Sequence, residues 1–339
     1  MNAVPRLSIG LPVYNGGGYL AESLEALLGQ SYEDFELIIS DNASTDGTVG
    51  ICRRYEKQDP RIRYVRQPHN IGLVPNHNFV VGQARGELFK WASHDDLYAR
   101  DLLERCIDAL DQHPQAVLAQ SWSATIDSSG TPTKLLRYPA ATASSRAPER
   151  FRSMLFDGKG DYTYAVMRTN ILRQTPLHAS YHFADRTLIT ELALHGPFRQ
   201  VPDWLYFRRD RPDQPRLTVR DRCAIFDPRR ANPLRHPAVR LYAEYIWGYL
   251  TAIRRAPLSP ADRRECYLHL ARWLASRAVP ARKPLGEPIS ARQPVIYLAR
   301  WLTSLALPGR DVRVGEPTPT ERPVISVDAV VPGRDRGPS

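Results

Sequence analysis

Two adjacent carboxylates, Asp95 and Asp96, follow an apolar segment at 87–92, where they are well placed to bind a cation. Like charges held side by side repel each other, and a bound divalent cation relieves that repulsion. Magnesium and manganese favour oxygen ligands, and they commonly combine one or two carboxylates with the oxygens of a substrate diphosphate. The same two residues would also suit a simple cap of the helix that follows. The pair alone leaves both interpretations open.

Two other polar segments have the residue types that bind a nucleotide. Asp41 opens the turn Asp41-Asn42-Ala43-Ser44-Thr45-Asp46-Gly47, and its carboxylate can accept from the imide of a uracil or from ribose hydroxyls. Tyr14 and Asn15 precede three glycines, which let backbone approach a ligand closely, while the tyrosine can lie against a planar base. An ordinary capping turn would use similar residues. Neither segment matches a P-loop or a dinucleotide-binding fingerprint.

The elements around these residues follow the pattern of strand–helix–strand units. Strands are expected at 7–13, 35–40, 62–66 and 87–92, and helices at about 20–28, 48–55 and 76–84. This order predicts an α/β fold with a doubly wound sheet, in which ligands bind beyond the carboxyl ends of the strands. The polar clusters at 14–16, 41–46 and 94–96 all follow such ends. We therefore expect them to converge in space.

The rest of the chain is less regular up to about residue 236 and helical beyond it. Helices are expected at about 101–112, 149–156 and 185–195, strands at 117–126, 162–167 and 204–207, and a loop at 131–148. Apolar stripes predict further helices from 238, from 259 and over 295–307. The segment 309–339 is rich in proline, arginine and glycine, so we expect a flexible tail there.

Composition limits the partners of the protein. The formal net charge is +10, which attracts anions, but the basic residues are scattered without interleaved aromatics, so nucleic acid is not an expected partner. The four cysteines are far apart and are expected to be reduced. Neither a signal-peptide pattern nor an apolar run of membrane-spanning length is evident, which predicts a cytoplasmic protein. Arg300 and Trp301 would suit a peripheral contact with the inner face of the membrane.

Taken together, these segments resemble glycosyltransferase family 2, whose members have the GT-A fold. The resemblance reaches from about residue 5 to 210 and is carried by Leu11-Pro12-Val13-Tyr14-Asn15, Ser40-Asp41-Asn42-Ala43-Ser44-Thr45-Asp46-Gly47-Thr48, Asn70-Ile71-Gly72, Ala84-Arg85-Gly86-Glu87 and His94-Asp95-Asp96. It implies a GT-A catalytic domain over 1–236, with a nucleotide-binding half at 1–100 and an acceptor half at 101–236. A C-terminal helical region would follow at 237–308.

The resemblance also implies a role for each matching residue. The donor nucleotide would be bound by Pro12, Tyr14, Asn15, Asp41, Asn70 and Asp95. Within this set Asp41 would bind the base and Asp95 would face the ribose, while Asp96 would hold manganese or magnesium. His94 stands where many relatives have an aspartate two residues before the metal ligand. This departure puts the metal dependence in question, and it makes His94 a candidate neutral donor to the diphosphate.

Two later segments complete the site that the resemblance implies. Family members use a carboxylate as general base at a helix start roughly 90 residues past the acidic pair, and Asp185 stands there. A general base must reach the acceptor hydroxyl on the side opposite the leaving diphosphate. A basic loop that folds over the diphosphate corresponds to Tyr206–Arg211, which lacks the usual histidine. Arg208 or Arg209 would then contact phosphate oxygens.

The expected activity is therefore an inverting, metal-assisted hexosyl transfer from a UDP-, dTDP- or GDP-sugar to an acceptor hydroxyl. A sugar nucleotidyltransferase is an alternative, although Gly16-Gly17-Gly18 lacks the adjoining basic residues that a triphosphate needs. A domain that binds a nucleotide sugar without transferring it is a second alternative. The acceptor stays open among a cell-surface polysaccharide, a lipid-linked saccharide and a natural-product aglycone. The helices after 237 would pack on the catalytic domain, form a homodimer or touch a membrane.

Overall fold

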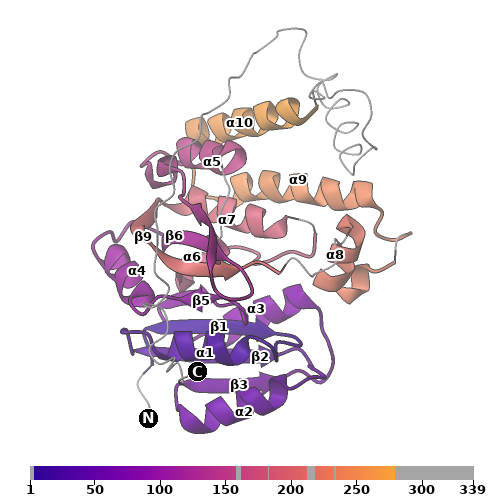
Figure 1. Ribbon diagram of the computed structural model, residues 1–339. Helices are drawn as coiled ribbons and strands as arrows, with labels where there is room; N and C mark the ends of the chain where they lie inside the picture. The colour runs from indigo at the N-terminus through magenta and orange to yellow at the C-terminus, as the bar shows by residue number, and fades with distance from the viewer. Residues whose placement is uncertain (1–3, 158–161, 182, 212–217, 233, 279–339) are drawn as a thin grey trace.

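The computed structural model describes residues 4–157, 162–181, 183–211, 218–232 and 234–278 (Figure 1). The helix expected at 295–307, the tail at 309–339 and the proposed membrane contact at Arg300 and Trp301 lie outside these residues. Within the described ranges, no helix has both the length and the hydrophobicity that a membrane span requires. The four cysteines are buried free thiols, as expected.

The first half of the chain folds as the alternation of strands and helices predicts. Four strands lie parallel, because each pair of consecutive strands is joined by a crossover helix. The strands are β1 (Leu7–Val13), β2 (Phe35–Asp41), β3 (Ile62–Arg66) and β4 (Leu88–Trp91). The helices between them are α1 (Leu20–Leu28), α2 (Thr48–Gln58) and α3 (Leu73–Gln83).

The second half extends the same sheet with mixed pairing. Its strands are β5 (Leu97–Tyr98), β6 (Leu118–Ile126), β7 (Pro132–Leu136), β8 (Val166–Arg168) and β9 (Phe198–Arg209). In the described part of the chain the order is β3-β2-β1-β4-β8-β6-β9-β5, with β7 paired to β6. The short β5 lies antiparallel to β9, with Leu97 opposite Phe207, so the chain just after the acidic pair is fixed to a strand more than 100 residues later.

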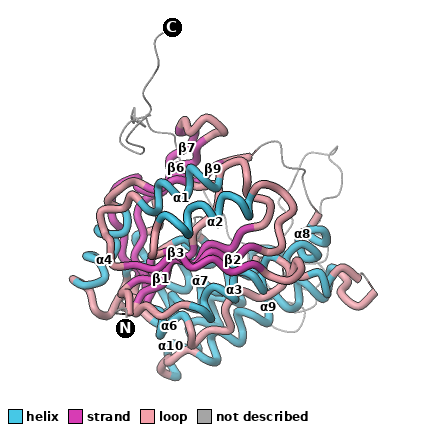
Figure 2. The backbone as a smooth tube through the Cα atoms, turned by 90° about the horizontal axis from the view of Figure 1, so that it is seen from below, coloured by secondary structure: helices cyan, strands magenta, loops and turns pink. Residues whose placement is uncertain are grey.

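Helices cover both faces of this sheet. Helices α1, α2 and α4 (Leu102–Asp111) share one apolar core with the alternating side chains of β1, such as Leu7, Ile9 and Leu11. Helix α3, α6 (Thr169–Leu172) and α7 (Ala184–His195) pack in a second core on the other face. Figure 2 shows the helices on either side of the strands. The doubly wound α/β arrangement is confirmed.

The two C-terminal helices within the described residues pack on the rest of the molecule. Helix α9 (Ala238–Arg255) lies against α7, and α10 (Pro260–Ala278) against α5 (Ala147–Phe156). Aromatic and aliphatic side chains fill the space between them, including Tyr245, Tyr249 and Trp273. Figure 1 shows this layer at the end of the molecule opposite α2 and β3. Of the three interpretations of these helices, packing on the main domain is the one observed.

Several elements differ from the prediction. The expected loop at 131–148 contains β7 and a 3-10 turn, η1 (Ala140–Ala143), because a hairpin partner supplies hydrogen bonds that local sequence does not reveal. The expected strand at 162–167 is a 3-10 turn, η2 (Tyr162–Tyr164), followed by β8. Strand β9 begins at Phe198, earlier than expected. Helix α8 (Val219–Phe226) and the turn η3 (Pro228–Arg230) were not predicted.

Candidate functional site

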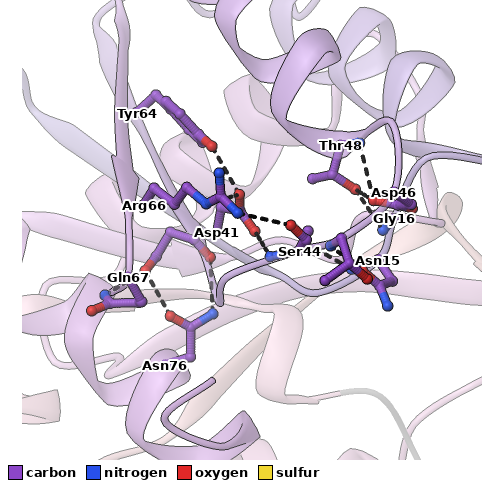
Figure 3. Close-up of polar contacts among 12 residues, drawn as sticks. Asn15, Gly16, Asp41, Ser44, Asp46, Thr48, Tyr64, Arg66, Gln67 and Asn76 are labelled. Carbon is purple, nitrogen blue, oxygen red and sulfur yellow. Dashed lines mark hydrogen bonds and ion pairs between the residues drawn. The ribbon is translucent and has the colours of Figure 1, made fainter. Parts of the chain in front are cut away.

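The loops that follow β1 and β2 are joined by hydrogen bonds between one backbone and the other loop's side chains (Figure 3). The Asn15 amide donates to Ser44 Oγ at 2.9 Å, and the Thr45 amide donates to Asn15 Oδ1 at 2.9 Å. The Gly16 amide donates to Thr48 Oγ1 at 2.9 Å. The two polar clusters predicted to meet beyond the strand ends are therefore one connected structure.

Each loop contains a residue with left-handed backbone, and at Ala43 this conformation is strained. Asn15 has φ 51° and Ala43 has φ 61°, in the left-handed region that L-residues other than asparagine and aspartate rarely adopt. Such conformations persist only where the surrounding structure imposes them, and they cluster at functional sites. The cross-loop hydrogen bonds to Asn15 are what holds this conformation in place. The strain gives the loop cluster a feature beyond an ordinary capping turn.

Asp41 ends β2 with its side chain fully buried. Its Oδ1 accepts from the Ser44 amide at 2.8 Å, and its Oδ2 accepts from the Tyr64 hydroxyl at 2.8 Å. Burial, followed by the neighbouring Asp41, raises the pKa of Tyr64, so this phenol stays a donor at physiological pH. Arg66 Nε lies 3.8 Å from Oδ2. The carboxylate is thus held by contacts with Ser44, Tyr64 and Arg66, as Figure 3 shows.

The remaining residues expected at the base pocket differ in their surroundings. Pro12 is buried within β1, whereas Tyr14 is 45% exposed in the following loop, where its ring surface can contact a ligand. Asn70 Oδ1 accepts from Asn42 Nδ2 and from the Gly72 amide, both at 2.9 Å. Asn70 therefore fixes the turn that leads into α3, which is a structural task that the sequence did not reveal.

Gly72 connects this turn to the unpredicted segment η3. Its φ is 95°, and a Cβ built on it would lie 2.6 Å from Pro228 Cδ. Beside this contact, Asp227 accepts from Ser180 Oγ at 3.2 Å. The turn at Asn70–Gly72, η3 and the chain before α7 are consequently in contact.

The acidic pair lies at the end of β4, and the protein neutralises Asp95 with an arginine. Asp95 Oδ1 accepts from the Ser93 hydroxyl, and Arg211 Nε lies 3.0 Å from Asp95 Oδ2. Arg211 was missed by the sequence analysis, which considered only Arg208 and Arg209. In an extended chain, residues two apart share one side, so the spacing from Arg209 to Arg211 was the available signal.

Asp96 is almost completely buried, and β9 supplies its partners. Its Oδ2 accepts from the Tyr206 hydroxyl, and its Oδ1 accepts from the Arg209 amide at 2.9 Å. These contacts follow from the pairing of β5 with β9, since Tyr98 lies opposite Tyr206. A helix cap is therefore not the role of this side chain, because its hydrogen bonds go to the sheet.

Arg209, expected at the diphosphate, is buried and contacts protein acceptors. Its guanidinium is 1% exposed and donates to the carbonyls of Asp95, Asp127 and Ser128 and to Glu22 Oε2, at 2.8–3.2 Å. Four of the five N–H groups of this buried guanidinium have protein acceptors, so a phosphate contact would have to displace them. Arg209 instead fixes the backbone of Asp95. Arg208 is exposed and stays a candidate for phosphate contact.

His94 lies between the acidic pair and the first loop. A Cβ built on Gly16 would lie 2.9 Å from His94 Cδ2, so the imidazole packs directly on that loop. Burial lowers the pKa of His94, with the Asp95 carboxylate opposing the shift. The ring is therefore neutral near pH 7, with one N–H to donate. His94 brings the third polar cluster against the first, as the strand order predicts.

The residues fit a divalent cation only with help from a substrate. Within the part of the chain that the structure describes, no three His, Cys, Asp or Glu side chains converge in a metal-binding arrangement. Asp95 and Asp96 already accept hydrogen bonds or ion pairs from the protein, yet each carboxylate has further lone pairs. Two carboxylates completed by diphosphate oxygens make a donor set that magnesium and manganese accept. The fit thus depends on a bound diphosphate.

Asp185 is in the first turn of α7 with its side chain exposed. The chain before this helix is fixed beside the end of β4, because Asn78 Nδ2 donates to the His178 carbonyl at 2.8 Å and the His178 ring lies 4.8 Å from that of Trp91. Phe183, just before the helix, has φ 67°. The chain seven residues before Asp185 is thus anchored at the end of β4.

A buried lysine lies behind the acidic pair and was also missed. Lys90, 1% exposed on β4, donates to the Tyr164 carbonyl and lies 5.2 and 5.5 Å from the ring centres of Tyr98 and Tyr206. Burial lowers the pKa of Lys90 to about 8, against partial support from Cys106 and Asp96. Tyr206 therefore separates a buried ammonium from the Asp96 carboxylate that its hydroxyl contacts.

The buried charge of Lys90 is expected to lower the stability of the fold by an amount that depends on pH. We expect Lys90→Met to raise the free energy of unfolding by about 1–3 kcal/mol at pH 7, since a pKa unit corresponds to about 1.4 kcal/mol and the ring contacts offset part of the penalty. The unfolded chain binds more protons between pH 8 and 10.5, so the wild type gains stability as pH rises through that window. The difference in free energy of unfolding between Lys90→Met and the wild type should therefore shrink as the pH rises through that window.

Denaturant unfolding at pH 7 and pH 9.5 measures this difference. The matched control is Lys57→Met, which changes an exposed lysine on α2. A gain of equal size at both pH values would contradict a buried charge at position 90.

Known proteins share both the sequence pattern and the fold. The family described as "Glycosyl transferase family 2" matches residues 8–177. The putative glycosyltransferase EpsE of Bacillus subtilis is 36% identical over 114 residues, covering 33% of this chain and 41% of that protein. The putative teichuronic acid biosynthesis glycosyltransferase TuaG of the same organism is 35% identical over 107 residues, covering 32% and 42%. The aligned segments thus span less than half of either relative.

Solved structures extend the likeness over most of the chain. Staphylococcus aureus TarS 1–349 in complex with UDP-GlcNAc has a TM-score of 0.60 at 18% identity, covering 80% of this chain and 72% of that one. The mannosyltransferase PcManGT of Pyrobaculum calidifontis, in complex with GDP-Man and Mn2+, has a TM-score of 0.51 at 17% identity, covering 90% and 81%. These likenesses confirm the GT-A fold. With the family match over half its length, this chain belongs to glycosyl transferase family 2.

Proposed function

We propose that this protein transfers a hexose from a nucleoside-diphosphate sugar to an acceptor hydroxyl with inversion at the anomeric carbon. The observation that carries the proposal is the fixed Asp41 carboxylate, joined through the cross-linked loops to His94 and the acidic pair. A rigid acceptor for a base, a neutral imidazole and two carboxylates are then arranged along one edge of the sheet. A nucleotide sugar has a base, a ribose and a diphosphate in that order.

We propose that the donor is a uridine nucleotide sugar. The Asp41 carboxylate is buried and accepts from Ser44 and Tyr64, yet it keeps further lone pairs, so the imide N–H of uracil would bind it once the loop cluster opens to admit the base. The exposed ring of Tyr14 would lie against the base, and Asp95 would accept from ribose hydroxyls. Thymidine has the same imide and guanosine has an N–H edge of its own, so dTDP- and GDP-sugars are the competing donors. The UDP-GlcNAc complex of TarS supports the uridine choice.

The diphosphate would lie between the acidic pair and the basic chain after β9. We assign His94 as a neutral donor to it, Arg208 and Arg211 as its cations, and Asp96 as the residue that holds manganese or magnesium. Such an ion would stabilise the negative charge of the leaving diphosphate. Binding requires Arg211 to share or leave the Asp95 carboxylate, 3.0 Å away, in favour of phosphate oxygens. Arg209 acts only by positioning Asp95.

Transfer itself would use Asp185 as general base. The acceptor oxygen attacks the anomeric carbon while its proton passes to the Asp185 carboxylate, and the bond between that carbon and the diphosphate oxygen breaks on the opposite side. The nucleoside diphosphate leaves with the electron pair of that bond. Inversion follows because attack and departure occur on opposite faces. We propose a cell-surface polysaccharide or a lipid-linked saccharide as acceptor, which the name of TuaG supports.

A thermal-shift comparison of UDP-, dTDP- and GDP-sugars, each with and without manganese, tests the donor site. A ligand that binds the folded state raises its apparent stability, by about 2.7 kcal/mol at 100 times its Kd. We expect the UDP-sugars to give the largest increase in Tm and manganese to enlarge it. UMP without the diphosphate is the matched control and should gain nothing from manganese. Equal Tm values with all donors and with none would refute the proposed activity.

A further inference from the structure

A groove on the helical layer is left unexplained by the donor site. It has a volume of about 310 Å³ and lies between α9, the start of α7 and the chain at 176–181. This volume is within the range of small-molecule sites, about 300–1,000 Å³. Figure 1 shows α9 running beside α7, at a distance from the loops after β1 and β2. The groove is therefore a separate feature from the nucleotide pocket.

The groove has an aromatic platform. Trp247 is 59% exposed on α9, although a large apolar ring normally gains about 1.5–3 kcal/mol from burial. Gly248 and Thr251 continue the same helical stripe along the groove. The C–H groups on one face of a pyranose ring carry partial positive charge, and they pack on the negative face of an indole. An exposed tryptophan bordering a polar groove is a suitable platform for a sugar ring.

Two ion pairs flank this platform. Glu191 on α7 receives both Nε and Nη2 of Arg255 at 2.9 Å, and its side chain is 3% exposed. Arg230 of η3 pairs with Glu244 of α9. Within each pair the opposite charges cancel, so these lining charges favour neither an anion nor a cation. The lone pairs and N–H groups that the ion pairs do not use can bind hydroxyls. A neutral, polyhydroxylated ligand matches this composition better than a phosphate or a lipid headgroup.

The groove connects to the donor site through η3. Pro228 packs on Gly72, next to the turn that Asn70 fixes, while Arg230 two residues later lines the groove. Directly before Pro228, Asp227 accepts from Ser180, in the chain that borders the groove and leads to Asp185. Leu177 in the same chain has φ 61°, a strained conformation that indicates a constrained surface. A ligand in the groove would therefore lie next to the elements that border the site of transfer.

We propose that this groove binds the non-reacting part of a neutral saccharide acceptor, with one sugar ring packed on Trp247. The proposal rests on the proposed glycosyltransferase function and adds to it the neutral charge of the acceptor and its place on the protein. Remote contacts of this kind raise the local concentration of the acceptor and orient its reactive hydroxyl.

Retention on an array of bacterial capsular and O-antigen polysaccharides, with heparin and polyglutamate as anionic spots, tests the groove. We expect at least one neutral glycan to bind, and Trp247→Ala to weaken it at least tenfold. The change is at an exposed site, so the fold should survive. Trp247→Phe, which keeps a ring, should restore part of the binding. The control is Phe156→Ala, which removes another exposed ring, 43% accessible, outside the groove.

The donor titration separates failure of the groove from failure of the proposed function. Trp247→Ala should leave the UDP-sugar thermal shift unchanged, so loss of both readings would indicate a folding defect and overturn the assignment of Trp247. Retention of no neutral glycan, equal retention by wild type and Trp247→Ala, or binding to the anionic spots alone would overturn the groove as a saccharide site. Glycan retention without any donor shift would keep the groove and refute the transfer activity.

Discussion

Asp185→Asn is expected to lower the turnover of sugar transfer by at least about 100-fold while leaving donor affinity unchanged. Amide replaces carboxylate with nearly the same shape, so the acceptor hydroxyl loses its proton acceptor, and general-base catalysis typically contributes about 10²–10⁴-fold. Release of the nucleoside diphosphate under saturating donor and acceptor measures the turnover, and calorimetric titration of the donor measures binding.

The matched control for that variant is Asp262→Asn, an acid in the first turn of α10. Both changes remove a charge that favours a helix N-terminus, an effect of about 0.3–1 kcal/mol, so both should lower stability similarly. Only Asp185→Asn should lower turnover. Unchanged turnover in Asp185→Asn would remove this residue from the mechanism, and equal losses in both variants would show that the effect is on the fold.

Asp96→Ala is expected to abolish the gain in donor affinity that manganese provides, a loss of about 100-fold when the ion supplies the charge stabilisation of the diphosphate. Titration of a UDP-sugar with and without manganese measures it. The change also leaves the Tyr206 hydroxyl and the Arg209 amide without their acceptor, at about 1–3 kcal/mol each. Asp96→Asn keeps an oxygen at the position and serves as the second variant.

Asp101→Ala is the control for that experiment, since this half-buried acid lies in the same segment and its carboxylate pairs with Arg105 at 3.4 Å. It should retain the full manganese effect. If Asp96→Asn also retained it, Asp96 would be a structural residue and the metal, if bound, would be held elsewhere. Such a result would give more weight to Arg211 as the cation that faces the diphosphate.

The parallel half of the fold was predictable because its signals are local. The apolar alternation of β1 and the helical spacing of α1 indicate which face of each element is buried. Each of the first four strands is joined to the next by one helix, and the pairs are β1 with β2, β2 with β3 and β1 with β4. Asp41 could be predicted as a site residue for the same reason, because it ends a strand whose neighbouring strands were predictable from the sequence. The position of Asn15 against Ser44 follows once those two strands are paired.

The roles of the arginines were not predictable in this way. Arg208, Arg209 and Arg211 lie within four residues of sequence, yet Arg208 is exposed, Arg209 is buried beside the acidic pair and Arg211 pairs with Asp95. The distinction depends on how β9 lies against β5 and β6, a register set by contacts from residues far away in the chain. Lys90 is a similar case, since a lysine within an apolar strand has no local signal for the tyrosines around it.

The acidic pair shows the division most clearly. Two carboxylates after a strand, together with the segments at Tyr14 and Asp41, were predicted to converge because parallel strand ends meet at one edge of a sheet, and the resemblance to glycosyltransferase family 2 implied a nucleotide-sugar site there. Only the tertiary structure decided that Arg211 neutralises Asp95 and that Tyr206 and Arg209 hold Asp96. Side-chain periodicity reports which residues are buried, whereas the partner of a buried charge is set by long-range strand pairing.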